Sequence, residues 1–176
     1  MGNIYIIGYM ASGKSTFGRA LAQRTGRKFI DLDEELERRT GLTISELMGK
    51  IGETKFREME RETLRQVVHE ENAVISCGGG TPCHHDNMEM MNASGTTVWL
   101  ETSVERIVIR VKEAGDTRPL LSKVPEEELA DYVRRHLEAR LPYYEKAQIR
   151  FSGERLENEK EIEESVEFFL MHNALF

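Results

Sequence analysis

GYMASGKST, at residues 8–16, is the stretch that decides the fold of this chain. It fits the phosphate-binding pattern of a glycine, four residues, Gly-Lys and then Ser or Thr. Residues 4–7 are apolar and mostly β-branched, which predicts a buried strand, and residues 17–25 predict a helix. In a strand–loop–helix arrangement, the loop N–H groups and the helix N-terminus surround phosphate oxygens. The stretch therefore predicts a nucleotide site rather than only a glycine turn, with Lys14 at the terminal phosphates and Ser15 at Mg²⁺.

Strand and helix patterns alternate along the rest of the chain. Further short apolar stretches predict strands at residues 28–32, 73–76, 96–100 and 148–151. The helical segments are expected at residues 34–39, 52–69, 104–112, 126–147 and 159–173, with a capping box at 43–46. This alternation is typical of an α/β fold, so we expect three layers, α/β/α, around a five-stranded parallel sheet with right-handed crossovers. Pro142 predicts a kink or break in its helix.

The composition is that of one globular domain. The chain has 176 residues and a net charge of −7, which argues against broad nucleic-acid binding. No apolar run is long enough for a membrane span, and no secretory signal is seen, so we expect a cytoplasmic protein. The only cysteines, Cys77 and Cys83, should then be reduced. Together with His84 and His85 they match no common zinc spacing, which favours loop and helix-start residues.

Two aspartates, Asp31 and Asp33, stand at the end of the predicted second strand. Residues two apart in a strand face the same side, and ligands bind beyond the carboxyl ends of parallel strands. One carboxylate could serve magnesium, directly or through water. The other could accept hydrogen bonds from a substrate hydroxyl and withdraw its proton. The alternative is that Asp33 only caps the next helix.

A triple glycine, residues 78–80, follows the predicted third strand. Three glycines let a ligand approach the backbone N–H groups closely, whereas a tight turn needs only one. Arg57, Arg118 and Arg140 are candidates for contacts with carboxylate or phosphate, although nothing in their positions alone separates them from surface arginines. The polar segment 113–125 contains glycine and proline and is the candidate mobile loop.

Six motifs of the chain, taken together, resemble those of shikimate kinases, a family of nucleoside-monophosphate-kinase-like P-loop enzymes. Between residues 4 and 151 they occur in family order as GYMASGKST, FIDLDEEL, GETKFREME, SCGGGTP, DTRPLL and ARLPYYEKA. The resemblance implies a single kinase domain over residues 1–176, with a substrate-binding helical region at about 33–61 and a mobile lid at about 113–125. It also implies ATP- and Mg²⁺-dependent phosphorylation of the 3-hydroxyl of shikimate in aromatic amino acid biosynthesis.

The resemblance implies roles for individual residues as well. Asp33 is the implied catalytic base, while Lys14 and the lid residue Arg118 stabilise the transferred phosphoryl group. Ser15 ligates Mg²⁺, and Asp31 lies near the metal through water. The residues implied to bind ATP are Ala11, Ser12, Gly13, Lys14, Ser15, Thr16, Arg110 and Arg118, with Arg110 near adenine. Those implied to bind shikimate are Asp33, Arg57, Gly78, Gly79, Gly80 and Arg140, with Phe56 and Met48 as pocket walls.

The chain departs from the family pattern in its loop and in its tail. Ala11 stands where the family commonly has glycine, and residues beyond 151 match only a closing helix. The alternatives are a gluconate-type kinase, whose substrate also has a carboxylate and hydroxyls, and a non-catalytic nucleotide-binding homologue. A substrate panel in a coupled ADP assay separates these alternatives. The expected partners are ATP and shikimate, without nucleic acid or membrane, and the chain is expected to be a monomer.

Overall fold

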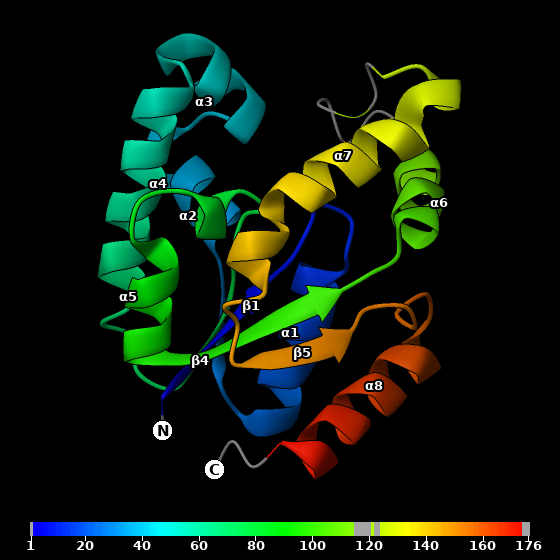
Figure 1. The fold of residues 1–176 in the computed structure, drawn as a ribbon. Coiled ribbons are helices and arrows are strands. Elements are labelled where there is room, and N and C mark those ends of the chain that lie inside the picture. The colour runs from blue at the N-terminus through cyan, green and yellow to red at the C-terminus, as the bar shows by residue number, and fades with distance from the viewer. Residues whose placement is uncertain (1, 115–120, 122–123, 174–176) are drawn as a thin grey trace.

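Five parallel strands form the centre of the protein, which is seen here in a computed structural model that describes residues 2–114, 121 and 124–173. The strands are β1 (Asn3–Ile7), β2 (Lys28–Asp31), β3 (Ala73–Ser76), β4 (Gly95–Glu101) and β5 (Ile149–Ser152). Their order across the sheet is β2-β3-β1-β4-β5, so the first strand of the chain lies in the middle (Figure 1). The parallel pairing of β1 with both β3 and β4 confirms the expected α/β class.

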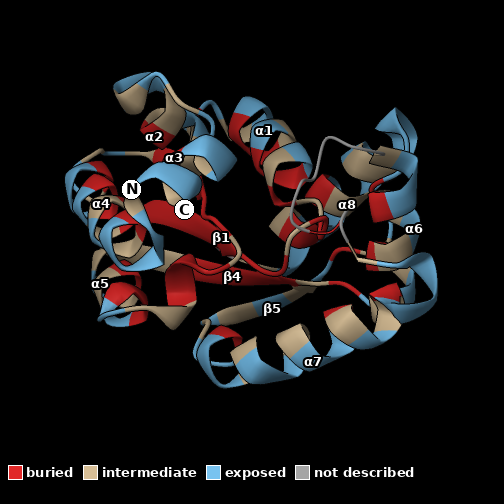
Figure 2. Cartoon of the chain, turned by 90° about the horizontal axis from the view of Figure 1, so that it is seen from above, coloured by how far each residue is buried: buried red, intermediate tan, exposed pale blue. Residues whose placement is uncertain are grey.

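Helices cover both faces of the sheet. They are α1 (Lys14–Thr25), α2 (Leu32–Thr40), α3 (Ile44–Ile51), α4 (Glu53–Val67), α5 (Asn87–Ser94), α6 (Val104–Ala114), α7 (Glu126–Tyr144) and α8 (Glu159–His172), with a short 3₁₀ helix, η1 (Thr81–Cys83). Ile4 and Ile6 pack into one core with α1 and α8, whereas Tyr5 and Ile7 pack into the other core with α4 to α7. Figure 2 shows the buried strands β1 and β4 between these helices. Within the described residues, no helix is long and apolar enough to cross a membrane.

A smaller core holds α2, α3 and α4 together beside the sheet. Leu36, Leu47 and Phe56, one from each of these helices, are buried against one another. The predicted capping box begins α3, because the Thr43 hydroxyl accepts the Glu46 N–H at 3.2 Å and the Glu46 carboxylate accepts the Thr43 N–H at 2.9 Å. These helices thus form a separately packed wall next to the carboxyl ends of β2 and β3.

Besides shifts of a few residues at the ends of several helices, the helices differ from expectation in three respects. Leu32 was expected in a strand, but it begins α2, because the carboxylate of Asp31 accepts the N–H groups of Asp33 and Glu34 and caps the helix. The helix α5 was not predicted. Pro142 does not break α7, which continues to Tyr144. Proline has no N–H, so α7 lacks one intrahelical hydrogen bond at this point, and only two residues of the helix follow it.

Candidate active site

The carboxyl ends of β1, β2 and β3 meet at one edge of the sheet. Ser76 pairs in register with Asp31 on one side and with Ile6 on the other, so the following loops begin at the same level. The cavity there has a volume of about 220 Å³. It is lined by Met10, Ala11, Gly13, Lys14, Ser15, Thr16, Asp31, Asp33, Ser76, Cys77, Gly78 and Gly79. The structure therefore brings the phosphate loop, both aspartates and two of the glycines into one space.

The phosphate loop needs an unusual backbone. Gly13 has a φ of 95° and Ala11 a φ of 63°, both in the left-handed region. For alanine this conformation costs about 1 kcal/mol, which gives a physical reason why glycine suits position 11. The loop places Lys14 at the start of α1, where the first-turn N–H groups have no partner within the helix. The Lys14 ammonium group donates to the carbonyl oxygen of Tyr9 at 2.8 Å. The site thus combines a cation with N–H groups that are suited to bind an anion.

Three oxygen-bearing side chains lie together under the loop. The Ser15 hydroxyl donates to Asp31 Oδ2 at 2.6 Å and lies 3.2 Å from the hydroxyl oxygen of Ser76. Hydroxyl and carboxylate oxygens are the donors that Mg²⁺ prefers, and this ion takes few protein ligands when a nucleotide supplies the rest. No larger cluster of His, Cys, Asp and Glu occurs in the described part of the chain. The donor set at Ser15 and Asp31 therefore fits a magnesium ion bound with phosphates.

Asp33 lies in the first turn of α2 and faces the same cavity. Burial, followed by the negative charges of Asp31 and Glu60, raises its pKa from 3.8 to about 6, while Lys14 opposes this rise. Because Asp33 lies in a helix, strand alternation does not explain why it faces the cavity together with Asp31. The residue that caps the helix is Asp31, not Asp33. A carboxylate with a pKa this close to neutrality is suited to accept a proton and release it again.

Arg57 approaches the glycine loop from α4. Its Nη1 donates to Glu60 Oε1 at 3.0 Å, and the other carboxylate oxygen of Glu60 accepts the Thr81 hydroxyl at 2.8 Å. Glu60 is only 1% exposed, so its charge depends on these two partners. A Cβ atom at Gly80 would lie 2.5 Å from Arg57 Nη2, which explains the absence of a side chain there. Glu60 was missed from the sequence, although its spacing of three from Arg57 places both on one helix face.

Arg140 approaches from α7 on the other side of the glycines. Its guanidinium carbon lies 5.0 Å from the ring centroid of Tyr9, and a Cβ at Gly79 would lie 3.2 Å from its Nη1. This Nη1 atom is buried and has no hydrogen-bond partner among the described residues. The N–H groups of Gly78, Gly79 and Gly80 also donate no hydrogen bond within the described residues. Gly78 and Gly79 line the cavity, whereas Gly80 and Arg140 are not among its lining residues. Unused donors of this kind are suited to an oxygen-rich anionic ligand.

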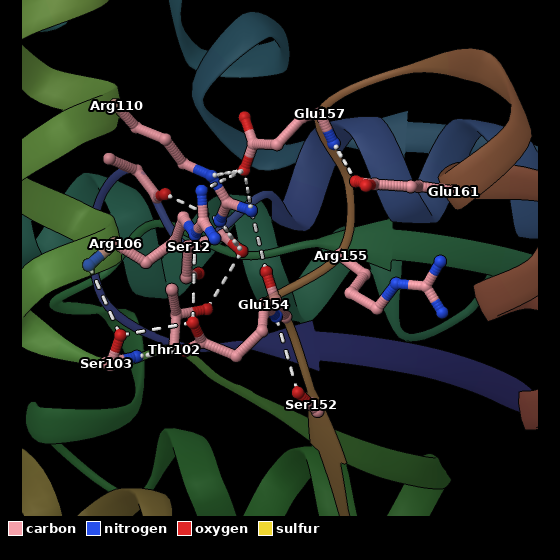
Figure 3. Close-up of polar contacts among 12 residues, drawn as sticks. Ser12, Thr102, Ser103, Arg106, Arg110, Ser152, Glu154, Arg155, Glu157 and Glu161 are labelled. Atoms are coloured by element: carbon pink, nitrogen blue, oxygen red, sulfur yellow. Dashed lines mark hydrogen bonds and ion pairs between the residues drawn. The ribbon is translucent and has the colours of Figure 1, made fainter.

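Arg110 fastens the phosphate loop to the segment after β5. It donates to the carbonyl oxygens of Ser12 at 3.0 Å and Gly153 at 2.7 Å, and to the Glu157 carboxylate at 2.7 Å (Figure 3). A second cavity of about 330 Å³ lies beside it. That cavity is lined by Ala11, Gly13, Thr16, Arg110, Glu113, Ala114, Leu156 and Glu157. This cavity adjoins the phosphate loop at Ala11, Gly13 and Thr16. The contact of Arg110 with adenine stays a prediction.

The remaining predicted site residues are Arg118, Phe56 and Met48. Arg118 lies outside the described residues. Phe56 is 2% exposed and belongs to the small core of α2, α3 and α4, against which Met48 packs. Their role as pocket walls stays a prediction. Tyr9 and Tyr144 were not singled out from the sequence, yet each contacts a residue predicted to bind the substrate. Tyr9 contacts Arg140, and Tyr144 contacts Gly79.

Comparison with known proteins identifies the relatives of this arrangement. The family model for shikimate kinase matches residues 10–170. A curated shikimate kinase from Parabacteroides distasonis is 44% identical over 162 residues, which is 92% of this chain and 94% of that protein. The crystal structure of shikimate kinase from Bacteroides thetaiotaomicron is 40% identical, with a TM-score of 0.91 and 97% of each chain covered. Shikimate kinase from Acinetobacter baumannii in complex with shikimate is 34% identical, with a TM-score of 0.86 over 100% of this chain and 96% of that one.

Proposed function

This chain belongs to the shikimate kinase family and catalyses the ATP-dependent phosphorylation of shikimate in aromatic amino acid biosynthesis, and from this premise we propose how its residues carry the reaction. The acceptor is the 3-hydroxyl of shikimate. The observation that carries the proposal is one cavity with Lys14 on its donor side and Asp33 beside Gly78 and Gly79 on its acceptor side. A phosphoryl group can pass between two bound substrates only where both sites open into the same space.

The acceptor site holds shikimate by its carboxylate. Arg140 and Arg57 supply the positive charge, and the N–H groups of Gly78, Gly79 and Gly80 supply further donors. This proposal is supported by the unused Nη1 atom of Arg140, because a buried guanidinium nitrogen without an acceptor is costly until a ligand provides one. Charged hydrogen bonds to a planar carboxylate also fix the orientation of the ring that carries it.

Asp33 is the base of the proposed reaction. It accepts the proton of the 3-hydroxyl as the hydroxyl oxygen attacks the γ-phosphorus, and the bond from that phosphorus to the bridging oxygen of ADP breaks. Lys14 stabilises the charge that develops on the transferred group. Residues Ala11, Ser12, Gly13, Ser15 and Thr16 bind the phosphates of ATP. Asp33 then releases its proton, which its pKa of about 6 allows near neutral pH.

Magnesium and the lid complete the proposed donor site. Ser15 would ligate the ion and Asp31 would hold it through water, which fits their 2.6 Å contact. The ion, when bound, neutralises phosphate charge. The lid is proposed at residues 113–125, where Arg118 would close over the phosphates, and the substrate-binding region is proposed at residues 33–61. We further propose that the chain is one kinase domain that works as a monomer in the cytoplasm.

Replacing Arg140 with alanine tests carboxylate recognition. We expect the KM for shikimate to rise roughly 10- to 100-fold, because a charged hydrogen bond to the substrate is lost. The KM for ATP should change by less than about twofold, since Arg140 contacts the acceptor side. Steady-state kinetics with each substrate varied in turn measures both constants.

The control for this substitution is Arg134→Ala, which removes an exposed arginine of α7 that pairs with Asp131. It should leave both KM values unchanged. A larger rise in the KM for ATP than for shikimate in Arg140→Ala would contradict the assignment.

The pH dependence of the reaction tests Asp33 without a substitution. The folded-state pKa of about 6 means that the base is ionised above this pH and protonated below it. At saturating MgATP, we therefore expect kcat/KM for shikimate to be constant at higher pH and to fall about tenfold per pH unit below a pH of about 6. A rate profile measured in buffers of equal ionic strength checks this. Constant kcat/KM down to a pH of about 5 would contradict a base with this pKa.

A further inference from the structure

Tyr144 joins the end of α7 to the glycine loop. Its side chain is fully buried, and its ring lies 5.9 Å from the ring of Trp99 at an interplanar angle of 37°. Its hydroxyl donates to the carbonyl oxygen of Gly79 at 2.6 Å. Burial raises the pKa of Tyr144 above its usual range, so the hydroxyl keeps its proton and remains a donor. A buried tyrosine with a short hydrogen bond to a loop carbonyl restrains the position of that loop.

The Gly79 carbonyl determines the direction of a neighbouring N–H group. The C=O of Gly79 and the N–H of Gly80 belong to one planar trans peptide, so they point in opposite directions. Holding the oxygen at Tyr144 therefore directs the Gly80 N–H away from α7. Arg57 closes the other side of Gly80, with its Nη2 atom 2.5 Å from the place of a Cβ. Three consecutive glycines have little conformational preference of their own, so such outside contacts must set the peptide plane.

The same helix end carries Arg140. Tyr144 follows Arg140 by four residues, one turn later in α7, so both side chains leave the same face of the helix. Arg140 packs on the ring of Tyr9, and its Nη1 would be 3.2 Å from a Cβ at Gly79. One turn of α7 separates Arg140 from Tyr144, and the Tyr144 hydroxyl is bonded to Gly79. This turn therefore sets the distance between the guanidinium group and the glycine N–H groups.

We propose that Tyr144 is a positioning residue for the acceptor site, whose hydroxyl fixes the Gly79–Gly80 peptide relative to Arg140 so that both hold the shikimate carboxylate and ring in one geometry. The inference rests on the proposed function of Arg140 and of the glycines. Tyr144 itself does not touch the substrate. Its effect is therefore expected in the affinity for shikimate and not in the affinity for ATP.

The substitution Tyr144→Phe removes only the hydroxyl and keeps the ring beside Trp99. We expect the KM for shikimate to rise about five- to tenfold, the value of a lost hydrogen bond that leaves a buried carbonyl unpaired. The KM for ATP should stay within about twofold. The Kd for shikimate, measured by calorimetry without nucleotide and well below the melting temperature, should rise by the same factor as KM. This binding measurement keeps the test valid if the variant melts earlier than the wild type.

The matched control is Tyr143→Phe, the same change at the neighbouring exposed tyrosine, whose ring faces Lys146. It should leave both substrates unaffected. A lower melting temperature of Tyr144→Phe with an unchanged KM and Kd for shikimate would overturn the proposal, because the hydroxyl would then serve stability alone. Equal rises in both KM values would also overturn it.

Arg140→Lys separates failure of the inference from failure of the proposed function. If Arg140→Lys raises the KM for shikimate and Tyr144→Phe does not, only the positioning role is wrong. If neither variant changes it, the carboxylate site itself is misassigned, and the inference falls with it.

Discussion

Replacing Asp33 with asparagine is expected to lower kcat by about 10³-fold, within the usual contribution of a positioned general base. Asparagine has nearly the same shape and can still hydrogen-bond a hydroxyl, but it cannot take the proton. The KM for ATP should therefore stay near its wild-type value, because the phosphate loop is untouched. A coupled ADP assay at saturating substrates measures the loss. A normal kcat in this variant would refute the role of Asp33 as base.

The same substitution should stabilise the fold at neutral pH. Because the folded-state pKa of Asp33 is raised from 3.8 to about 6, the folded protein binds this proton more tightly than the unfolded chain does. Wild-type stability therefore falls as the pH rises from about 4 to about 6, and the cost is fully present above that window. Asparagine removes a cost on the order of 1–3 kcal/mol, so the melting temperature should rise at neutral pH and change little at low pH.

The control is Glu34→Gln, the next residue of α2, whose exposed carboxylate pairs with Arg19. This change should leave kcat within about twofold of the wild type, since an exposed ion pair contributes little. Comparing the two variants across pH separates the half-buried carboxylate of Asp33, the proposed base, from a surface charge on the same helix turn.

Replacing Lys14 with alanine is expected to lower kcat/KM for ATP by about 10³-fold or more, because a preorganised charge at the transferred group is lost. Lys14 is 9% exposed, so water does not readily replace its charge. ADP binding, followed by calorimetry, should weaken less than turnover, since the loop N–H groups remain.

Lys28→Ala is the control for this change, because Lys28 is an exposed lysine that pairs with Glu70. It should retain wild-type rates. Turnover of Lys14→Ala within about tenfold of the wild type would contradict its role at the transferred phosphoryl group.

The sequence predicted those parts of the fold whose signals are local. The strands that end at Ile7, Asp31, Ser76 and Glu101 contain short apolar runs, and Thr43 and Glu46 predict the capping box of α3. The helix α5 was missed because Met88 and Met91 are its only buried apolar residues, and its preceding residue, Asp86, makes no side-chain cap. The local pattern also failed to place Leu32 in a helix. Asp31 is the last residue of β2, and its side chain caps the helix that begins at Leu32.

Some residues of the candidate site could be predicted from a local motif, others only from a family resemblance, and others not at all. Lys14 and Ser15 follow from a motif in which spacing alone determines geometry. Arg57 and Arg140 required a family resemblance, because no local pattern separates an arginine beside the glycine loop from one at the surface. Glu60 and Tyr144 act on residues far away in the chain, Glu60 on Thr81 and Tyr144 on Gly79, so only the folded arrangement reveals them.

The central place of β1 in the sheet has a consequence for how the protein is made. Ile4 pairs with Val74 on one side and with Thr96 on the other, so β1 cannot gain either strand partner until those residues have left the ribosome. Forming these contacts requires closing long loops, which slows folding. The strand that leads into the nucleotide loop, although it is translated almost first, thus has no strand partner until residues 74–76 of the 176 are available, and its second partner comes later still. A nascent chain shortened before β4 should therefore be unable to retain ATP.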